Sequence, residues 1–134
     1  MVIMALQTYR DLDVWKKSVD CVEEIYKLTR GFPPDEKYGL TSQMRRAAVS
    51  VPANIAEGYG RKHRGDYLHH LSFARGSLAE LETHLIIAVR LQFLTKEEAQ
   101  DVWPLLQDVG KMLNRLHSSL APKPETPNPE PELT

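Results

Sequence analysis

The sequence predicts an all-α fold: an antiparallel up-down-up-down four-helix bundle with a Pro-rich C-terminal tail. Apolar residues recur every three or four positions over four long segments, and no segment alternates as a strand would. The links between the segments are only about two to four residues long, which favours antiparallel neighbours. With 134 residues the chain is long enough for one domain. We expect an N-terminal segment (1–10), the bundle (11–120) and the tail (121–134).

The first helix is predicted from about Asp11 to Arg30, where Gly31 and two prolines end it. Its expected core face has apolar residues at alternating spacings of three and four. These residues are Leu12, Trp15, Val19, Val22 and Tyr26.

The second helix is predicted from about Asp35, a suitable N-cap, to Tyr59. Its apolar stripe is Leu40, Met44, Ala47, Val51 and Ile55. Pro52 lies inside this stripe, so the segment forms either one kinked helix or two short helices. The stripe keeps its phase through Ile55, which favours the kinked helix.

The third and fourth helices have the strongest patterns. The third, over about 64–92, has a seam of Leu71, Ala74, Leu78, Leu81, Leu85 and Ala88, widened by Leu68, Ile86, Val89 and Phe93. The fourth begins at a capping box formed by Thr95 and Glu98. Its seam is Ala99, Val102, Leu106, Val109, Leu113, Leu116 and Leu120, and we expect Pro104 to bend it. Trp103, Leu105 and Met112 lie outside that seam, which indicates a subunit interface.

The composition is typical of a cytoplasmic protein. The net charge is -1, so binding to nucleic acid would need a local basic patch. The single cysteine, Cys21, lies in a helical pattern and is expected to pack inertly in a reducing compartment. No stretch is long enough to span a membrane, and the N-terminus does not resemble a signal peptide. The tail is expected to be extended, either free or docked as an arm on a neighbouring subunit or partner.

No motif predicts an enzyme or a cofactor. The serines have neither an elbow nor a triad context, and the Gly58-Tyr59-Gly60 run follows a helix rather than a strand. A di-metal bundle needs Glu-x-x-His motifs on two helices, and none occurs. Glu80 and His84 share a helix face but have no partner pair. We therefore expect no catalytic residues, no metal and no cofactor.

The basic cluster is the candidate site. Between Thr41 and Gly76 lie six basic residues and two acidic ones, for a net charge of +4. Phosphates pair with Arg and Lys, and unpaired bases stack on aromatic rings. The candidate nucleic-acid-binding residues are Arg45, Arg46, Arg61, Lys62, Arg64, Tyr59 and His63. The alternative is internal pairing of Arg45, Arg46 and Arg75 with Glu57, Glu80 and Glu82.

Several motifs resemble a known family. They include Asp13-Val14-Trp15-Lys16, the run from Leu40 to Ala48, Ser50-Val51-Pro52-Ala53-Asn54-Ile55-Ala56-Glu57-Gly58, and the run from Gly76 to Thr83. Together they resemble the bacterial four-helix-bundle proteins encoded in 23S rRNA intervening sequences, labelled S23, over roughly residues 6–120. The fold is similar to that of the accessory variability protein of diversity-generating retroelements.

The resemblance implies a cytoplasmic bacterial homo-oligomer, a ring-like homopentamer. The retroelement relative engages nucleic acid and a reverse transcriptase through a basic surface, which makes RNA, DNA or such an enzyme an expected partner. Most family members have no assigned activity. Two hypotheses remain open: a non-enzymatic nucleic-acid- or ribonucleoprotein-associated protein, and a protein–protein scaffold without nucleic acid.

Overall fold

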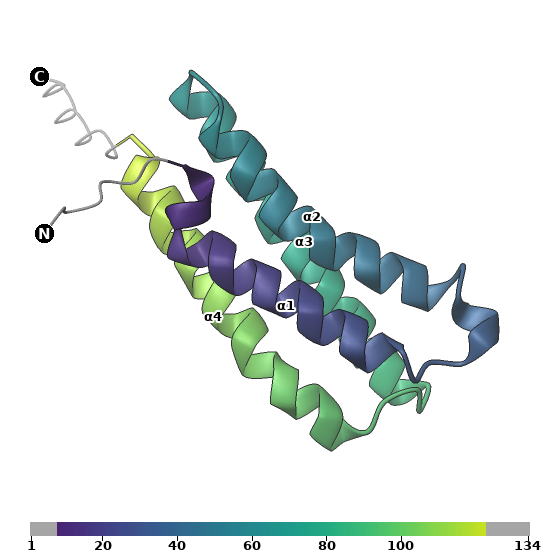
Figure 1. The fold of residues 1–134 in the computed structure, drawn as a ribbon. Helices are drawn as coiled ribbons and strands as arrows, with labels where there is room; N and C mark the ends of the chain where they lie inside the picture. The colour runs from purple at the N-terminus through teal and green to yellow at the C-terminus, as the bar shows by residue number, and fades with distance from the viewer. Residues whose placement is uncertain (1–7, 123–134) are drawn as a thin grey trace, which may run out of the picture.

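The computed structural model describes residues 8–122, and this part of the chain is all-α, with four long helices and no strand (Figure 1). The helices are α1 (Asp13–Thr29), α2 (Leu40–Tyr59), α3 (Arg64–Arg90) and α4 (Lys96–Leu120). Two short 3-10 turns, η1 (Tyr9–Asp11) and η2 (Pro34–Glu36), precede α1 and α2. Within the described residues, no helix is both long and apolar enough to cross a bilayer. Residues 1–7 and all of the predicted Pro-rich tail beyond Pro122 lie outside the described part.

The four helices pack as neighbouring pairs around one core. α2 packs against α1 and α3, and α4 packs against the same two helices. Side chains of α2 meet progressively earlier positions of α3 as α2 advances: Ser50 meets Ser77, and Asn54 meets His70. These two helices therefore run antiparallel, which brings the end of α2 and the start of α3 together.

The predicted seam of α3 is confirmed, because all six of its residues are buried. In α2 the stripe from Met44 to Ile55 is buried, and Leu40 is half-buried at the helix start. In α4 the central seam residues Val102, Leu106, Val109 and Leu113 are buried, whereas the seam residues near its ends are half-buried. Periodicity therefore identified the core face of three helices.

The predicted apolar stripe of α1 lies at the margin of the core, where Leu12, Trp15 and Val22 pack against buried residues, rather than in its centre. The buried positions are Val14, Ser18, Cys21, Ile25 and Thr29, whereas the predicted stripe is half-buried or, at Tyr26, exposed. Two buried positions are polar, but the Ser18 hydroxyl donates to the Trp15 carbonyl oxygen at 2.7 Å and the Thr29 hydroxyl to the Ile25 carbonyl oxygen at 2.8 Å. Because their hydroxyls bond within the helix, these residues can enter the core without an unpaired donor.

Two predicted helix starts also need correction. Asp11 belongs to η1, where it forms a capping box with Thr8, and α1 begins two residues later. Asp35 is not the N-cap of the second helix, because it lies in η2. α2 begins at Leu40, whose backbone N–H donates to the Glu36 carboxylate at 2.9 Å. The glutamate side chain thus satisfies a donor that the helix start leaves free.

The two interior prolines leave their helices continuous. α2 runs through Pro52 to Tyr59, so the alternative of two short helices is wrong, and α4 likewise runs through Pro104. The capping box of Thr95 and Glu98 is confirmed, with both of its hydrogen bonds formed.

The third helix ends at Arg90 rather than at the predicted Gln92. Gln92 has a φ of 64° and the Phe93 N–H donates back to the Ala88 carbonyl oxygen at 2.9 Å. This is the Schellman arrangement, in which a left-handed residue closes a helix.

Candidate functional site

A ladder of polar side chains joins α2 to α3 and leads to the turn between them. Ser50 and Ser77 share a hydrogen bond of 2.8 Å, and the Asn54 amide donates to the Ser50 carbonyl oxygen at 2.9 Å. The Asn54 amide oxygen lies 3.2 Å from Nδ1 of His70. The ladder thus accounts for Ser50 and Asn54, two polar residues of the motif that runs from Ser50 to Gly58.

At the end of α2, a carboxylate and a glycine bring this helix close to His70 of α3. Glu57 accepts from Arg61 at 2.7 Å and lies 3.9 Å from Nε2 of His70. At Gly58 the two helices are so close that an added Cβ would lie 2.8 Å from the Cβ of His70. This close approach fixes the position of residues 60–63, which connect α2 to α3.

Four of the predicted site residues come together at this turn: Arg61, Lys62, His63 and Arg64, which we call the basic turn. All four side chains are exposed. Arg61 is paired with Glu57, whereas Lys62 and Arg64 make no hydrogen bond or ion pair with another described residue. Two full positive charges of the turn are therefore available to a ligand.

The basic turn sits at the positive end of a helix. His63 is the N-cap of α3 but its side chain makes no capping hydrogen bond, and Arg64 is the first helical residue. Free backbone N–H groups at a helix start favour anions, and cations there are disfavoured by about 0.3–1 kcal/mol. Asp66 is the only acidic residue of the first turn. The arrangement costs stability and concentrates positive potential.

Tyr59 is less accessible than its sequence position suggested. Its ring is half-buried and packs edge-on against Tyr67, with 6.1 Å between ring centroids. Burial, and then the neighbouring Tyr59, raise the pKa of Tyr67 above its usual value. Both rings act mainly as packing beneath the basic turn.

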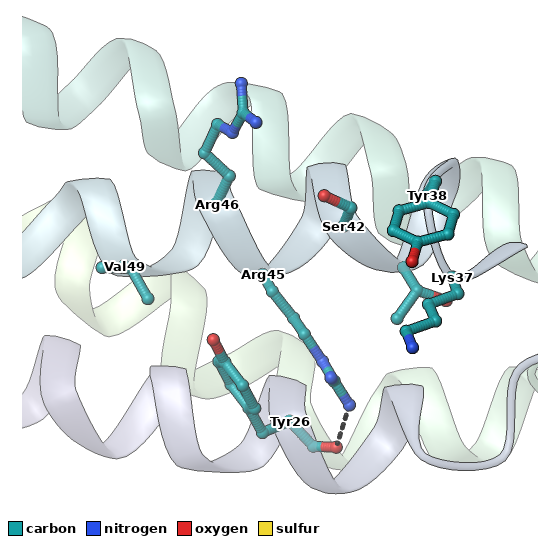
Figure 2. Close-up of a pocket in the computed structure, with 8 residues that line it drawn as sticks. Tyr26, Lys37, Tyr38, Ser42, Arg45, Arg46 and Val49 are labelled. Atoms are coloured by element: carbon teal, nitrogen blue, oxygen red, sulfur yellow. Dashed lines mark hydrogen bonds between the residues drawn. The ribbon is translucent and has the colours of Figure 1, made fainter.

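The remaining two predicted residues, Arg45 and Arg46, lie elsewhere on α2, beside a separate surface hollow (Figure 2). Arg46 is exposed and makes no hydrogen bond or ion pair with another described residue. Arg45 leans onto α1: its Nε donates to the Thr29 hydroxyl at 2.9 Å, and its guanidinium lies 4.4 Å from the centre of the Tyr26 ring. In Figure 2, Arg46 points away from this Arg45–Tyr26 pair.

Sequence reasoning missed the other six residues that line this hollow, and three of them come from outside α2. Lys37 and Tyr38 precede α2, and Tyr26 reaches the hollow from α1. Tyr26 had been assigned to the core, and the two others lay within the predicted second helix. The run Lys37-Tyr38-Gly39 could have shown that these residues form a loop, because a glycine that follows two polar residues is typical of a loop.

The alternative, in which the arginines pair with glutamates of adjacent helices, is wrong. Arg45 bonds to the Tyr26 carbonyl oxygen and the Thr29 hydroxyl rather than to a glutamate. Arg75 is exposed, without a hydrogen bond or ion pair to a described residue. Glu82 instead accepts from Gln107 on α4 at 3.4 Å. Burial raises the pKa of Glu82, and the Gln107 hydrogen bond opposes that shift.

The histidines and the cysteine of the described chain are its candidates for metal ligands or reactive groups. No three side chains of His, Cys, Asp or Glu lie close enough there to hold a metal ion. His84 is buried with Nδ1 unpaired, and its Nε2 lies 3.8 Å from Glu80. Cys21 is buried, and desolvation followed by the nearby Asp20 raises its pKa to about 12, which disfavours the reactive thiolate.

Comparisons with known proteins agree with this fold. A crystal structure at 1.70 Å of a protein of unknown function from the S23 ribosomal protein family of Bacteroides thetaiotaomicron VPI-5482 superposes with a TM-score of 0.70. It is 23% identical and the match covers 78% of this chain and 97% of the other, so it establishes similarity of fold. The search of curated proteins gave no match. The model of the 23S rRNA-intervening sequence protein family matches residues 10–115, and the chain therefore belongs to that family.

Proposed function

We propose that this chain is a non-enzymatic, oligomeric protein of the bacterial cytoplasm that associates with nucleic acid or a ribonucleoprotein through the basic turn. One observation carries the proposal: Lys62, His63 and Arg64 stand exposed at the positive end of α3, where cations weaken the helix. A phosphate bound there would remove this repulsion and accept hydrogen bonds from the free backbone N–H groups.

The expected binding is governed by phosphate charge rather than by sequence. The side chains of the basic turn are all basic or imidazole, and the phosphate contacts proposed for them fix position without specifying sequence. Affinity should therefore fall steeply with salt, because each neutralised phosphate releases counterions.

The proposed assembly is a homo-oligomer of antiparallel up-down-up-down bundles, a pentameric ring by family resemblance. What supports assembly is apolar surface: Ile86, Ile87 and Leu91 are exposed near the end of α3. On α4, Trp103, Leu105 and Met112 are only half-buried. Apolar surface of this kind commonly marks an interface. A ring would repeat the basic turn around its axis and would offer a nucleic-acid enzyme, such as a reverse transcriptase, a multivalent surface.

The direct test reverses the charge of the basic turn. We expect the Arg61→Glu, Lys62→Glu, Arg64→Glu triple variant to lose binding to a short RNA at low salt while keeping its oligomeric mass. Loss of the Arg61–Glu57 pair should cost only about 0.5 kcal/mol, because both side chains are exposed.

A matched control is available at the surface of other helices. Lys16, Lys111 and Arg115 are exposed, and reversing all three makes the same change in net charge. If this control weakens RNA binding as much as the triple variant does, net charge rather than the basic turn determines affinity. Unchanged RNA affinity of the triple variant would refute the assignment.

The second candidate is a protein–protein scaffold without a nucleic-acid role. A mainly apolar hollow between α3 and α4, lined by Ile86, Ala99 and Trp103 among others, favours it. Recovery of one protein partner after nuclease treatment, abolished by Trp103→Ser but not by reversal of the basic turn, would support the scaffold over the first proposal.

A further inference from the structure

The hollow beside Arg45 and Arg46 is distinct from the basic turn. It holds about 480 Å³, within the range of about 300–1,000 Å³ that small-ligand sites occupy. The hollow lies beside the first half of α2, whereas the basic turn follows the end of that helix; Arg46 precedes Tyr59 by 13 residues, or about 20 Å of helix. We call this the α1–α2 hollow; its lining is Tyr26, Lys37, Tyr38, Thr41, Ser42, Arg45, Arg46 and Val49.

The α1–α2 hollow has cations and no acid in its lining. Lys37, Arg45 and Arg46 contribute three positive charges. The carboxylate nearest in sequence, Glu36, does not line the hollow; it accepts a hydrogen bond from the Leu40 N–H at the start of α2. The hollow therefore favours an anionic ligand, and Arg geometry suits phosphate oxygens.

Arg45 is held in place by α1. It uses Nε and one terminal nitrogen to bond Thr29 and Tyr26, and it stacks over the Tyr26 ring. A guanidinium has five N–H donors, so about three remain for a ligand. A preorganised cation loses little entropy when it binds, whereas the unpartnered Arg46 can swing toward the ligand.

An aromatic ring stands at one end of the hollow. Tyr38 is 87% exposed, and Figure 2 shows it beside Ser42 with Lys37, opposite the end where Val49 lies. The Lys37 amine lies 5.5 Å from the centre of the Tyr38 ring. Because Lys37 lies over one face of this exposed ring, the opposite π-face is the one open to a base, and bases stack on such a face regardless of their identity.

We propose that the α1–α2 hollow binds one unpaired nucleotide, with its base stacked on Tyr38 and its phosphate held by Arg46 and Arg45. The ligand class is a single-stranded nucleic-acid segment, because bases inside a duplex cannot reach the ring. An acidic peptide would satisfy the cations but would leave the Tyr38 face unused. This inference deepens the proposed function and rests on it for the source of the nucleotide.

The test uses full-length protein, fluorescence anisotropy at low salt and three probes: an oligouridine of about ten nucleotides, a hairpin duplex of similar length and free uridine monophosphate. We expect Tyr38→Leu to weaken oligouridine binding about tenfold or more, and Tyr38→Phe to keep it. Duplex binding should be nearly unchanged by either variant. Arg46→Gln should weaken oligouridine and uridine monophosphate binding together.

A second exposed ring provides the control. Phe73 on α3 is 51% exposed and contacts His69 and His70 rather than the hollow. Phe73→Leu should leave oligouridine binding unchanged. Because Tyr38 is almost fully exposed, its variants should unfold at the wild-type temperature, which circular dichroism checks.

The outcomes separate this inference from the proposed function. If Tyr38→Leu binds oligouridine like wild type while reversal of the basic turn abolishes binding, the inference fails and the proposed function stands. If wild type binds neither RNA, the proposed function fails. Uridine monophosphate titration then decides: Tyr38-dependent binding supports the hollow as a free-nucleotide site, and no binding overturns it. Oligoglutamate is also tested as a competitor of oligouridine. If it displaces oligouridine equally from wild type and from Tyr38→Leu, the hollow is assigned to an acidic protein segment and the nucleotide inference is overturned.

Discussion

Replacing Gly58 by alanine should destabilise the protein although alanine is the better helix former. Gly58 is buried near the end of α2, and no described glycine has a positive φ, so its backbone would accept a side chain. The obstacle is steric: the new Cβ would lie 2.8 Å from the His70 Cβ and 3.3 Å from both the Tyr67 ring and the Tyr67 carbonyl oxygen.

The magnitude follows from two opposing effects. Alanine should gain about 1 kcal/mol over glycine in a helix. Carbon atoms pack best at about 3.5–4.0 Å, so α2 and α3 must separate by several tenths of an ångström or more. The atom met is a Cβ of α3, which cannot rotate away, and overpacking of this kind costs about 1–3 kcal/mol. We place the overpacking cost near the upper end of that range, so the free energy of unfolding should fall by about 1–2 kcal/mol after the gain in helix propensity is subtracted.

Urea unfolding measured by circular dichroism at one protein concentration gives the free energy of unfolding. Gly76→Ala is the matched control, since Gly76 is also helical but an added Cβ meets nothing within 4 Å. It should raise stability by about 0.5–1 kcal/mol. If Gly58→Ala is stabilised by the same amount, the close approach does not constrain the turn and the reasoning is wrong.

Three further predictions, each with its own variants, are tested by urea unfolding. Thr95→Ala should lose about 1 kcal/mol through its capping hydrogen bond, whereas Thr95→Ser should lose little; equal losses would contradict the role of the hydroxyl. Arg45→Lys should cost about 1 kcal/mol because lysine lacks the bond from Nε to Thr29 and the flat contact with Tyr26, and Arg46→Lys should be neutral. Burial raises the pKa of Cys21 to about 12 from 9.0, so the native thiol keeps a proton that the unfolded chain releases. The free energy of unfolding should therefore fall as pH rises above about 9. Between about pH 8 and pH 10 it should fall less for Cys21→Ala than for the wild type. Equal pH slopes for the two proteins would contradict the raised pKa of Cys21.

The fold was predictable in segments where apolar residues recur at helical spacing or where a capping motif marks the start of a helix. The seam of α3 combines large and small apolar residues at constant phase, and Thr95 with Glu98 marks the start of α4. The face of α1 was not predictable from apolar residues, because hydroxyls that bond within the helix allowed Ser18 and Thr29 to be buried. Trp15 instead lies at the margin, edge-on to Tyr9.

The candidate site was predictable only as a charge excess along the chain. The sequence grouped Arg45 and Arg46 with residues 61–64, but a rigid helix separates the two sets into a turn and a hollow. Contacts from other segments decide what each cation can do. Tyr26 holds Arg45 from α1, and Tyr38 completes the hollow from a loop that was predicted as helix. The contact of Tyr26 with Arg45 depends on tertiary packing and leaves no local signal, whereas Gly39 is a local signal for the loop that carries Tyr38.

The most direct test of the central proposal is the light-scattering mass of nuclease-treated protein, alone and with a short RNA at low salt. We expect a homo-oligomer whose mass rises by that of bound RNA at about 50 mM salt and returns to the protein value by about 200 mM. An oligomer whose mass does not change with RNA at low salt would contradict nucleic-acid association and favour the scaffold. A monomer under all conditions would contradict the proposed assembly as well.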